Sequence, residues 1–553
     1  MFFETTLAAG RIETLTANGC YTDRLLNDFV DDWAKRQPNK TAIVDARSRY
    51  SYGELRARAS TAALGFLDFG VRHGDVVTVQ LPNWNEFIVI ALALERIGAV
   101  INPVAPIFRS REMRSILRLA RSNAVVMPAS FRGFDYPAMY RTLCAELPTV
   151  ATQIVVGDGG STRECVSWDE LLDRGASRDR LCGALDRLRP GPNEVRELMF
   201  TSGTTGEPKG VMHTANTISA GVDPIMRTLG MSSDDVCHMA STLGHQTGFL
   251  YGMELALRSG ARLILQETWD AVHFVKLVEA ERITVTMGAT PFLADTLAAP
   301  NVAHHGMTSL RVFICGGAPI PRPLAERASR ELSCRLVPIW GMTEIGIVTT
   351  VGPQDPAAKI STSDGKPYPG AEVAVRADDG TPAPVGREGE LWTRTPAMFA
   401  GYSQGRAFTA QFFDADGWFQ TGDRATMDGE GYIRITGRSK DLIIRGGENV
   451  SVKEIEDVLI RHPKVRSVAV VAVPHPRLGE IGCACVVPEA GADPSLEELC
   501  ALLKEEQVTR QFWPERILVL DAFPMTPSGK IQKFRLREVA AEAGCAAASA
   551  TGS

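Results

Sequence analysis

Phe200-Thr201-Ser202-Gly203-Thr204-Thr205-Gly206-Glu207-Pro208-Lys209-Gly210 is the stretch that says most about the fold, with four hydroxyl side chains, three glycines and one lysine. It follows the apolar run Leu198–Phe200, which is typical of the end of a β-strand. Glycines let a backbone approach a ligand closely, and backbone N–H groups with Ser and Thr hydroxyls can surround phosphate oxygens. Lys209 adds a mobile positive charge. The segment therefore predicts a loop that binds a nucleoside triphosphate.

This loop differs from the phosphate-binding loop of P-loop kinases and GTPases. Their motif ends in Gly-Lys-Ser/Thr, whereas Lys209 is followed by Gly210. A flexible surface linker is also disfavoured, because linkers rarely place a lysine and two threonines between glycines directly after an apolar run. The loop indicates a nucleotide-binding protein of another class.

Length and composition restrict the class of protein. A chain of 553 residues is too long to fold around one hydrophobic core, so we expect roughly two to four domains. With 44% hydrophobic and 22% charged residues, the chain is neither disordered nor fibrous. The net charge of −6 argues against nucleic acid as a partner.

Cysteines and apolar runs predict a cytoplasmic protein. The eleven cysteines have no framework spacing and indicate reduced thiols. Cys483 and Cys485 alternate with apolar residues, so we expect them on one face of a strand and not in a metal site. The first residues do not resemble a signal peptide, and no apolar run is long enough for a transmembrane segment.

Strand-like and helix-like segments alternate along the chain. We expect strands at 75–81, 99–103, 310–315 and 335–340, and helices at 85–97 and 321–332. This alternation predicts βαβ units, and therefore an α/β fold with stacked, parallel-type sheets and helices. Ligands of such sheets bind beyond the carboxyl ends of the strands, where the glycines after Phe200 and after Cys315 lie.

The composition changes twice in the second half of the chain. Residues from about 365 to 438 are rich in Gly, Pro and short β-like runs and predict a β-rich subdomain. A compact α+β pattern follows, with helices at 452–461 and 496–506 and strands at 465–473 and 517–520. The predicted division is an N-terminal domain at 1–438, a hinge at 439–440, a small C-terminal domain at 441–545 and a frayed tail at 546–553.

Five further segments carry the most specific signal. They are Gly316-Gly317-Ala318-Pro319, Trp340-Gly341-Met342-Thr343-Glu344, Gln420-Thr421-Gly422-Asp423, Gly437-Arg438-Ser439-Lys440-Asp441 and Pro527-Ser528-Gly529-Lys530. Together with the opening loop, their order and spacing resemble the acyl-adenylate-forming superfamily. That superfamily comprises acyl-CoA synthetases, adenylation domains of peptide synthetases and firefly luciferase. The resemblance covers nearly the whole chain and implies a mobile C-terminal domain.

The resemblance implies an ATP site. Its residues would be Thr201, Ser202, Gly203, Thr204, Thr205, Gly206, Lys209, Gly317, Ala318, Pro319, Trp340, Gly341, Met342, Thr343, Asp423, Arg438 and Lys530. Within this set, Trp340 would stack on adenine and Asp423 would bind the ribose. Glu344 would bind Mg²⁺, for which a hard oxygen ligand is suitable. The implied catalytic residues are Lys530, Thr343, Glu344 and His245.

These residue types suit the adenylation of a carboxylate. A carboxylate and a triphosphate repel each other, and Lys209, Lys530 and Mg²⁺ would supply the cations that bring them together. Preorganised donors would stabilise the charge that develops on the oxygens at the α-phosphorus. Taken singly, each residue has a structural explanation, such as a turn for Asp423 or a helix cap for Glu344. The ordered set of six motifs favours function.

A second reaction step is implied by the same resemblance. A thiol, here coenzyme A, would attack the acyl-adenylate after the C-terminal domain has rotated about Lys440. The tunnel for coenzyme A would be lined by Arg445, Gly446, Gly447 and Glu448. Two alternatives stay open: a carrier protein as the acceptor of the acyl group, and the assembly of two chains into a homodimer.

The acyl pocket would be lined by His245, Gln246, Cys315, Gly316, Ile339, Ile345 and Thr349. No acidic residue stands where amino-acid-activating relatives pair with the substrate amine, so an amino acid is disfavoured. The segments 80–87 and 102–109 most resemble medium-chain fatty acid and cyclohexanecarboxylate CoA ligases. We therefore expect a carboxylate–CoA ligase for a medium-chain, alicyclic or aromatic acid. The alternatives are a stand-alone aryl-acid adenylating enzyme and an inactive family member that serves as a scaffold.

Overall fold

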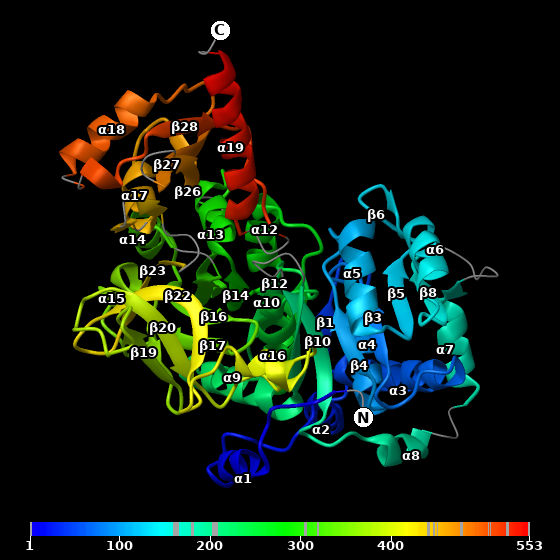
Figure 1. The fold of residues 1–553 in the computed structure, drawn as a ribbon. Coiled ribbons are helices and arrows are strands. Elements are labelled where there is room, and N and C mark those ends of the chain that lie inside the picture. The colour runs from blue at the N-terminus through cyan, green and yellow to red at the C-terminus, as the bar shows by residue number, and fades with distance from the viewer. Residues whose placement is uncertain are drawn as a thin grey trace.

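The protein is described by a computed structural model (Figure 1). The description covers residues 3–158, 165–178, 182–201, 208–302, 307–317, 320–438, 443–445, 448–450, 452–475, 479–506, 508, 510–526 and 530–550. In Figure 1 the helices α5, α6 and α7 and the strands β5, β6 and β8 lie on one side of the central strands, α1 lies apart near the bottom of the view, and α17, α18 and α19 lie at the top.

Two large sheets form the main body. The first has the order β18 (Lys366–Pro367), β17 (Gly346–Thr350), β16 (Arg335–Met342), β15 (Val312–Gly316), β14 (Val285–Gly288), β12 (Val236–Met239), β13 (Arg262–Leu265), β1 (Thr41–Val44) and β2 (Arg49–Ser51). Its strands from β16 to β1 are parallel. The second has the order β21 (Gly401–Tyr402), β11 (Lys209–Thr214), β10 (Val195–Thr201), β4 (Val100–Pro103), β3 (Val76–Val79), β5 (Ala124–Pro128), β8 (Thr152–Val156) and β9 (Val166–Ser167).

Helices cover these sheets and fill the space between them. They are α1 (Ala9–Ala17), α2 (Leu26–Arg36), α3 (Tyr52–Asp68), α4 (Asn85–Arg96), α5 (Ser110–Ala120), α6 (Tyr136–Glu146), α7 (Trp168–Ala176), α8 (Cys182–Leu185), α9 (Ala215–Thr228), α10 (Gln246–Gly248), α11 (Leu255–Ser259), α12 (Ala271–Glu281), α13 (Thr290–Ala298) and α14 (Arg322–Glu331). Short 3₁₀ turns lie at Asp186–Leu188 and Met307–Ser309, and β6 (Ser130–Phe131) pairs with β7 (Phe134–Asp135). The helix α4 is buried along nearly its whole length, and its middle, from Phe87 to Leu94, is entirely apolar.

A smaller antiparallel sheet forms the β-rich part. Its order is β19 (Glu372–Arg376), β20 (Gly389–Arg394), β22 (Phe419–Met427) and β23 (Ile433–Arg438), with the short helices α15 (Lys359–Thr362) and α16 (Arg406–Ala410) nearby. Its core joins Trp340, Phe399, Tyr402 and Phe419. The β-rich part therefore packs directly against β16 and β21 of the main body.

The C-terminal part has a sheet of its own. The order is β25 (Glu448–Val450), β24 (Ile443–Arg445), β27 (Gly479–Pro488) and β26 (Val465–His475), and β28 (Arg516–Val519) pairs with β27. The helices are α17 (Val452–Leu459), α18 (Leu496–Glu505) and α19 (Lys533–Ala550), with a 3₁₀ turn at Arg510–Phe512. Cys483 and Cys485 share one face of β27 and Ala484 packs on the other, so their prediction as strand residues is confirmed.

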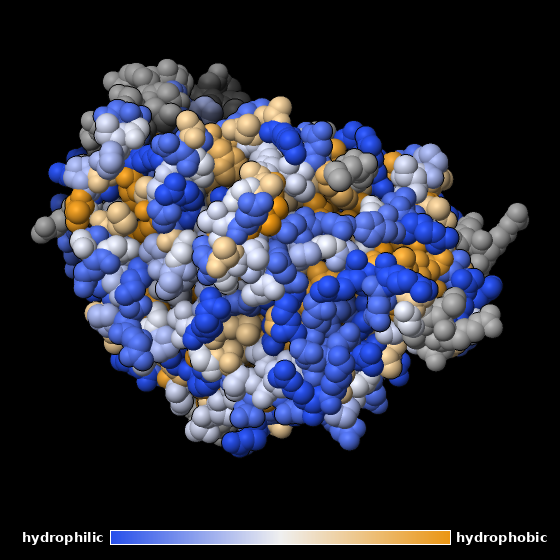
Figure 2. All heavy atoms as spheres, turned by 90° about the horizontal axis from the view of Figure 1, so that it is seen from below, coloured by the Kyte–Doolittle hydropathy of each residue, from blue (hydrophilic) through white to orange (hydrophobic). Residues whose placement is uncertain are grey.

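The predicted α/β class is confirmed, with one difference in local topology. We expected the phosphate-binding loop at the end of a strand in a βαβ arrangement. Instead, β10 and β11 are antiparallel neighbours, and Thr201 pairs with Lys209. Thr201 and Lys209, the described residues on either side of the predicted loop, are therefore held next to each other on paired strands, and residues 202–207 lie outside the described residues. The face in Figure 2 is mainly hydrophilic, with hydrophobic residues in separate patches.

Candidate functional site

Part of the predicted site lies outside the described residues. This applies to Ser202, Gly203, Thr204, Thr205, Gly206, Ala318, Pro319, Lys440, Gly446 and Gly447. For Arg438, Arg445 and Glu448 the strands are described but the side chains are not. The site below is built from the remaining predicted residues.

Lys209 stands where the hairpin returns to the sheet. Its Nζ lies 4.1 Å from the ring centre of Phe412 and 5.1 Å from that of Tyr402. A cation above an aromatic face is attracted by the electrons of the ring. The two rings therefore hold the ammonium group of Lys209 close to β21, which ends at Tyr402.

Thr343 and Glu344 lie in the turn between β16 and β17, where Met342 pairs with Gly346. The Glu344 side chain is buried, and its Oε1 accepts a hydrogen bond of 2.8 Å from the Tyr402 hydroxyl. The Phe399 N–H donates to the Glu344 carbonyl, also at 2.8 Å. Burial and the neighbouring Glu344 carboxylate raise the pKa of Tyr402, which keeps the phenol protonated and donating.

Trp340 and Asp423 come from different layers and meet in the core. The Trp340 Nε1–H donates to Asp423 Oδ2 at 2.8 Å, and both side chains are buried. Asp423 lies on β22 in register with Arg438 on β23. The carboxylate expected to bind a ribose is therefore oriented by the ring expected to stack on adenine.

Lys530 reaches the main body from the C-terminal part. A Cβ atom placed on Gly317 would lie 3.4 Å from Lys530 Cε and 4.0 Å from its Nζ. Gly317 follows β15 with φ of +81°, a conformation that favours glycine. The backbone of Lys530 is held by Thr526, whose Oγ1 accepts from the Lys530 N–H at 2.9 Å.

His245 lies in the same region and starts α10. Its Nδ1 accepts a hydrogen bond from the Thr247 N–H at 3.2 Å. Burial, assisted by the charge of Lys530, lowers the pKa of His245 to about 3. The imidazole is therefore neutral at physiological pH and adds no positive charge beside Lys530. A π-helical turn at Phe249–Glu254 follows α10, a feature frequent at functional sites.

Gln246 contacts a residue of β10. Its side chain is buried, and its Nε2 donates to Glu197 Oε2 at 3.4 Å. Burial raises the pKa of Glu197 to about 8, against the opposing effect of Arg196. In this structure Gln246 therefore contacts a buried, protonated carboxyl group.

The other predicted pocket residues have different packing neighbours. Gly316 and Ile339 are neighbours on β15 and β16. Cys315 packs with residues of α13 and α14, and Ile345 packs with Trp340 toward the β-rich part. Thr349 is buried and donates to the Asp364 carbonyl at 2.6 Å. Their role as a pocket stays a prediction.

Sequence reasoning missed two side chains that contact the Thr343–Glu344 turn. Tyr402 binds the Glu344 carboxylate, and the His213 Nε2 lies 2.8 Å from the Thr343 carbonyl oxygen. Neither stands in a recognised motif, and the two are separated from the turn by 58 and 130 residues. The two side chains lie on β11 and β21, which pair with each other although they are far apart in the sequence, and no local sequence pattern indicates that pairing.

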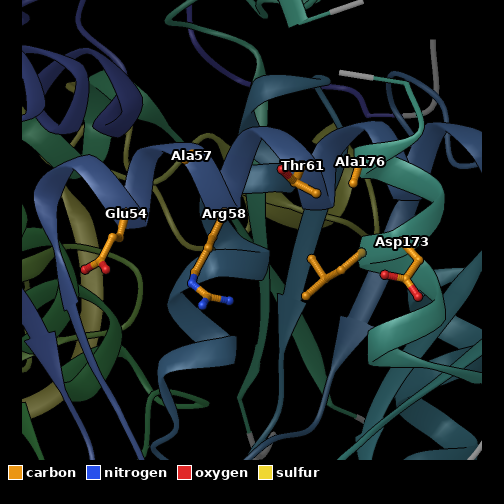
Figure 3. A pocket seen from close by; sticks show the side chains of 7 residues that line it. Glu54, Ala57, Arg58, Thr61, Asp173 and Ala176 are labelled. Atoms are coloured by element: carbon orange, nitrogen blue, oxygen red, sulfur yellow. The ribbon is translucent and has the colours of Figure 1, made fainter. Parts of the chain in front are cut away.

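A metal site made by protein alone is not found within the described residues, where no three His, Cys, Asp or Glu side chains are grouped for one. A shallow groove between α3 and α7 is lined by Glu54, Ala57, Arg58, Thr61, Leu172, Asp173 and Ala176 (Figure 3). The predicted site residues do not line this groove, which lies elsewhere on the protein.

Comparison with known proteins assigns the family. A family model described as "AMP-binding enzyme" matches residues 30–403, and "AMP-binding enzyme C-terminal domain" matches residues 454–530. The chain belongs to the AMP-binding enzyme family. A medium-chain fatty-acid–CoA ligase of Escherichia coli is 36% identical to this family member, over 94% of the chain and 91% of the ligase. A 2,3-dihydroxybenzoate-AMP ligase of Bacillus subtilis is 31% identical over 96% of both.

Solved structures agree with this assignment. ATP-bound MatB from Rhodopseudomonas palustris superimposes with a TM-score of 0.83 at 28% identity, covering 93% of this AMP-binding enzyme and 99% of MatB. The predicted family and its enzyme class, an AMP-forming acid–thiol ligase, are confirmed. In the part of the chain that the structure describes, no helix is long and apolar enough to cross a membrane.

Proposed function

We propose that this AMP-binding enzyme is an ATP-dependent carboxylate–CoA ligase. It forms an acyl-adenylate from a medium-sized apolar acid and then an acyl-CoA thioester. The observation that carries this proposal is the approach of Lys530 to Gly317 and His245. That approach puts a mobile cation where the predicted adenine segment meets the predicted acyl segment, which suits a lysine that bridges ATP and a carboxylate.

The nucleotide is held by residues from three layers in this proposal. The loop after Thr201 and Lys209 bind the β- and γ-phosphates, and Thr343 contacts the α-phosphate. Asp423 binds the ribose, with its Oδ2 oriented by Trp340. The predicted contacts of Gly341, Met342 and Arg438 complete this part of the site.

Glu344 is the residue that would hold Mg²⁺. Its carboxylate is buried and is kept in place by Tyr402, and oxygen is the ligand that Mg²⁺ prefers. A single protein carboxylate is in keeping with Mg²⁺ sites that rely on phosphate oxygens and water. Bound there, the ion would neutralise phosphate charge.

Adenylation then needs no protein nucleophile. A carboxylate oxygen of the acid attacks the α-phosphorus, the bond to the bridging oxygen breaks, and pyrophosphate leaves with the electron pair. Lys530 offsets the charge of the attacking carboxylate and of the α-phosphoryl oxygens. Lys209 stays with the departing pyrophosphate. His245 is neutral, so it positions the acyl group without competing for the anion.

Thioester formation follows when coenzyme A replaces the Lys530 segment. The C-terminal domain rotates about Lys440, and Arg445, Gly446, Gly447 and Glu448 line the entry for the thiol. The sulfur attacks the acyl carbon, and AMP leaves as the carbon–oxygen bond breaks. Coenzyme A as acceptor is supported by the E. coli relative. The dihydroxybenzoate relative favours the alternative, an aryl-acid adenylating enzyme.

A panel of acids tests the proposal directly. Medium-chain, alicyclic and aromatic acids are each incubated with Mg·ATP, with and without coenzyme A, and AMP and acyl-CoA are measured by mass spectrometry. We expect AMP release that depends on an acid, and acyl-CoA whenever coenzyme A is present. Acyl-AMP without any acyl-CoA would favour the aryl-acid alternative. Absence of ATP consumption with every acid would overturn both.

A further inference from the structure

His213 is a buried histidine whose two ring nitrogens are both engaged. It lies on β11, four residues after Lys209, and is 1% exposed. Its Nε2 is 2.8 Å from the Thr343 carbonyl oxygen, and its Nδ1 is 3.0 Å from the Thr217 hydroxyl on α9. The ring thus connects the strand of the phosphate loop to the turn that carries Thr343.

The partners determine the protonation of this ring. A carbonyl oxygen can only accept, so Nε2 carries the proton and Nδ1 accepts from the Thr217 hydroxyl. Burial lowers the pKa of His213 to about 4, although the bond to Thr343 opposes the shift. The imidazole is therefore neutral and fixed in one tautomer and orientation at physiological pH.

The Thr343–Glu344 turn is held at three points. His213 binds the carbonyl of Thr343, the Phe399 N–H binds the carbonyl of Glu344, and Tyr402 binds the Glu344 carboxylate. His213 and Tyr402 lie on paired strands, β11 and β21, with Val211 opposite Tyr402. The turn is consequently placed relative to β11, and hence relative to Lys209 at the start of that strand.

We propose that His213 is a positioning residue that fixes Thr343 and Glu344 relative to Lys209 during adenylation. Its contact with the turn is to the backbone carbonyl of Thr343, and it touches no reacting atom. The inference rests on the proposed function, because Thr343 and Glu344 are there assigned to the α-phosphate and Mg²⁺. A displacement of about 1 Å at such groups can lower a rate about 100-fold.

A second buried histidine provides a matched control. His238 on β12 is 2% exposed, and its nitrogens lie 2.9 Å from the Thr286 hydroxyl and 3.0 Å from Gln266 Oε1. Burial lowers its pKa to about 4 as well. His238 resembles His213 in burial, charge and partners, but it does not contact the Thr343–Glu344 turn. Its variants report the general cost of losing a buried histidine.

The test measures the two half-reactions, adenylation and thioester formation, separately. His213→Phe keeps the ring size and removes both hydrogen bonds, whereas the amide nitrogen of His213→Gln can replace Nε2–H. For His213→Phe we expect acid-dependent pyrophosphate exchange to fall about 100-fold, with acyl-CoA formation from supplied acyl-adenylate within about threefold of wild type. His213→Gln should exchange pyrophosphate at least about tenfold faster than His213→Phe. His238→Phe should leave the exchange rate per folded molecule at the wild-type value.

Equal losses in both half-reactions, equal losses in the His213 and His238 variants, or no rescue by glutamine would each overturn the proposal. If His213→Phe does not fold, His213→Gln is compared with His213→Asn, whose amide is one carbon shorter. Faster exchange in the glutamine variant supports the positioning role, and equal rates overturn it. Calorimetric titration with Mg·ATP needs no acid: weaker binding only in His213 variants supports the role even if no acid substrate is found, and unchanged binding overturns it in that case.

Discussion

Trp340→Phe isolates the hydrogen bond between the two predicted nucleotide residues. Phenylalanine keeps an aromatic face for adenine but loses the indole N–H that binds Asp423 Oδ2 at 2.8 Å. A hydrogen bond to a charged group contributes about 1.5–3 kcal/mol. With about 1.4 kcal/mol for each tenfold change, kcat/KM for ATP should fall about 10- to 150-fold.

The assay for this variant compares ATP with its 2′-deoxy and 3′-deoxy analogues in pyrophosphate exchange. If Trp340 orients a ribose-binding carboxylate, the variant loses part of its preference for ATP over the deoxy analogues. Trp392→Phe is the matched control, because it removes an indole N–H that donates to Glu390 at 3.2 Å in the same part of the molecule. An unchanged ATP-to-deoxy ratio in Trp340→Phe, with kcat/KM within twofold of wild type, would refute the reasoning.

Three further predictions concern Gly317, Tyr402 and His238. Gly317→Ala strains a backbone with φ of +81° and adds a methyl group 3.4 Å from Lys530 Cε. The rate of pyrophosphate exchange should therefore fall about tenfold, while the temperature of thermal unfolding shifts only slightly. A normal exchange rate would contradict the placement of Lys530. Tyr402→Phe removes the hydrogen bond that holds the Glu344 carboxylate. The Mn²⁺ concentration that gives half-saturation in the presence of ATP should therefore rise. An unchanged Mn²⁺ concentration at half-saturation would show that Tyr402 does not position the metal ligand. His238 has a folded pKa of about 4, below its unfolded value of about 6.5, so the unfolded state binds more protons between these pH values and stability is lost as the pH falls. In urea unfolding, His238→Gln should therefore lose about 1.4 kcal/mol less per pH unit than wild type in this window, and parallel curves would contradict the assignment.

The sequence predicted the parts of the site that depend on local pattern. Strands at 310–315 and 335–340 and the glycines after Cys315 could be located because apolar runs and glycines report burial and turns. The structure brings Lys530, Gly317 and His245 together, and likewise Trp340 and Asp423, as the order of the motifs led us to expect.

Contacts between distant strands were not predictable in this way. Hydrophobic periodicity says that a residue is buried but does not name its partner. The antiparallel pairing of β10 with β11, and of β11 with β21, brings His213 and Tyr402 to the Thr343–Glu344 turn. The contact of the Gln246 amide with Glu197 on β10 was likewise not predicted, and a role of Gln246 at the substrate stays a prediction.

Lys530→Ala tests the central claim most directly. Lys504→Ala, a lysine that matches no motif, serves as the control. If Lys530 bridges ATP and the carboxylate, pyrophosphate exchange falls at least about 100-fold, while acyl-CoA formation from supplied acyl-adenylate stays within about threefold of wild type. Equal loss of both half-reactions, or retention of exchange, would contradict the account.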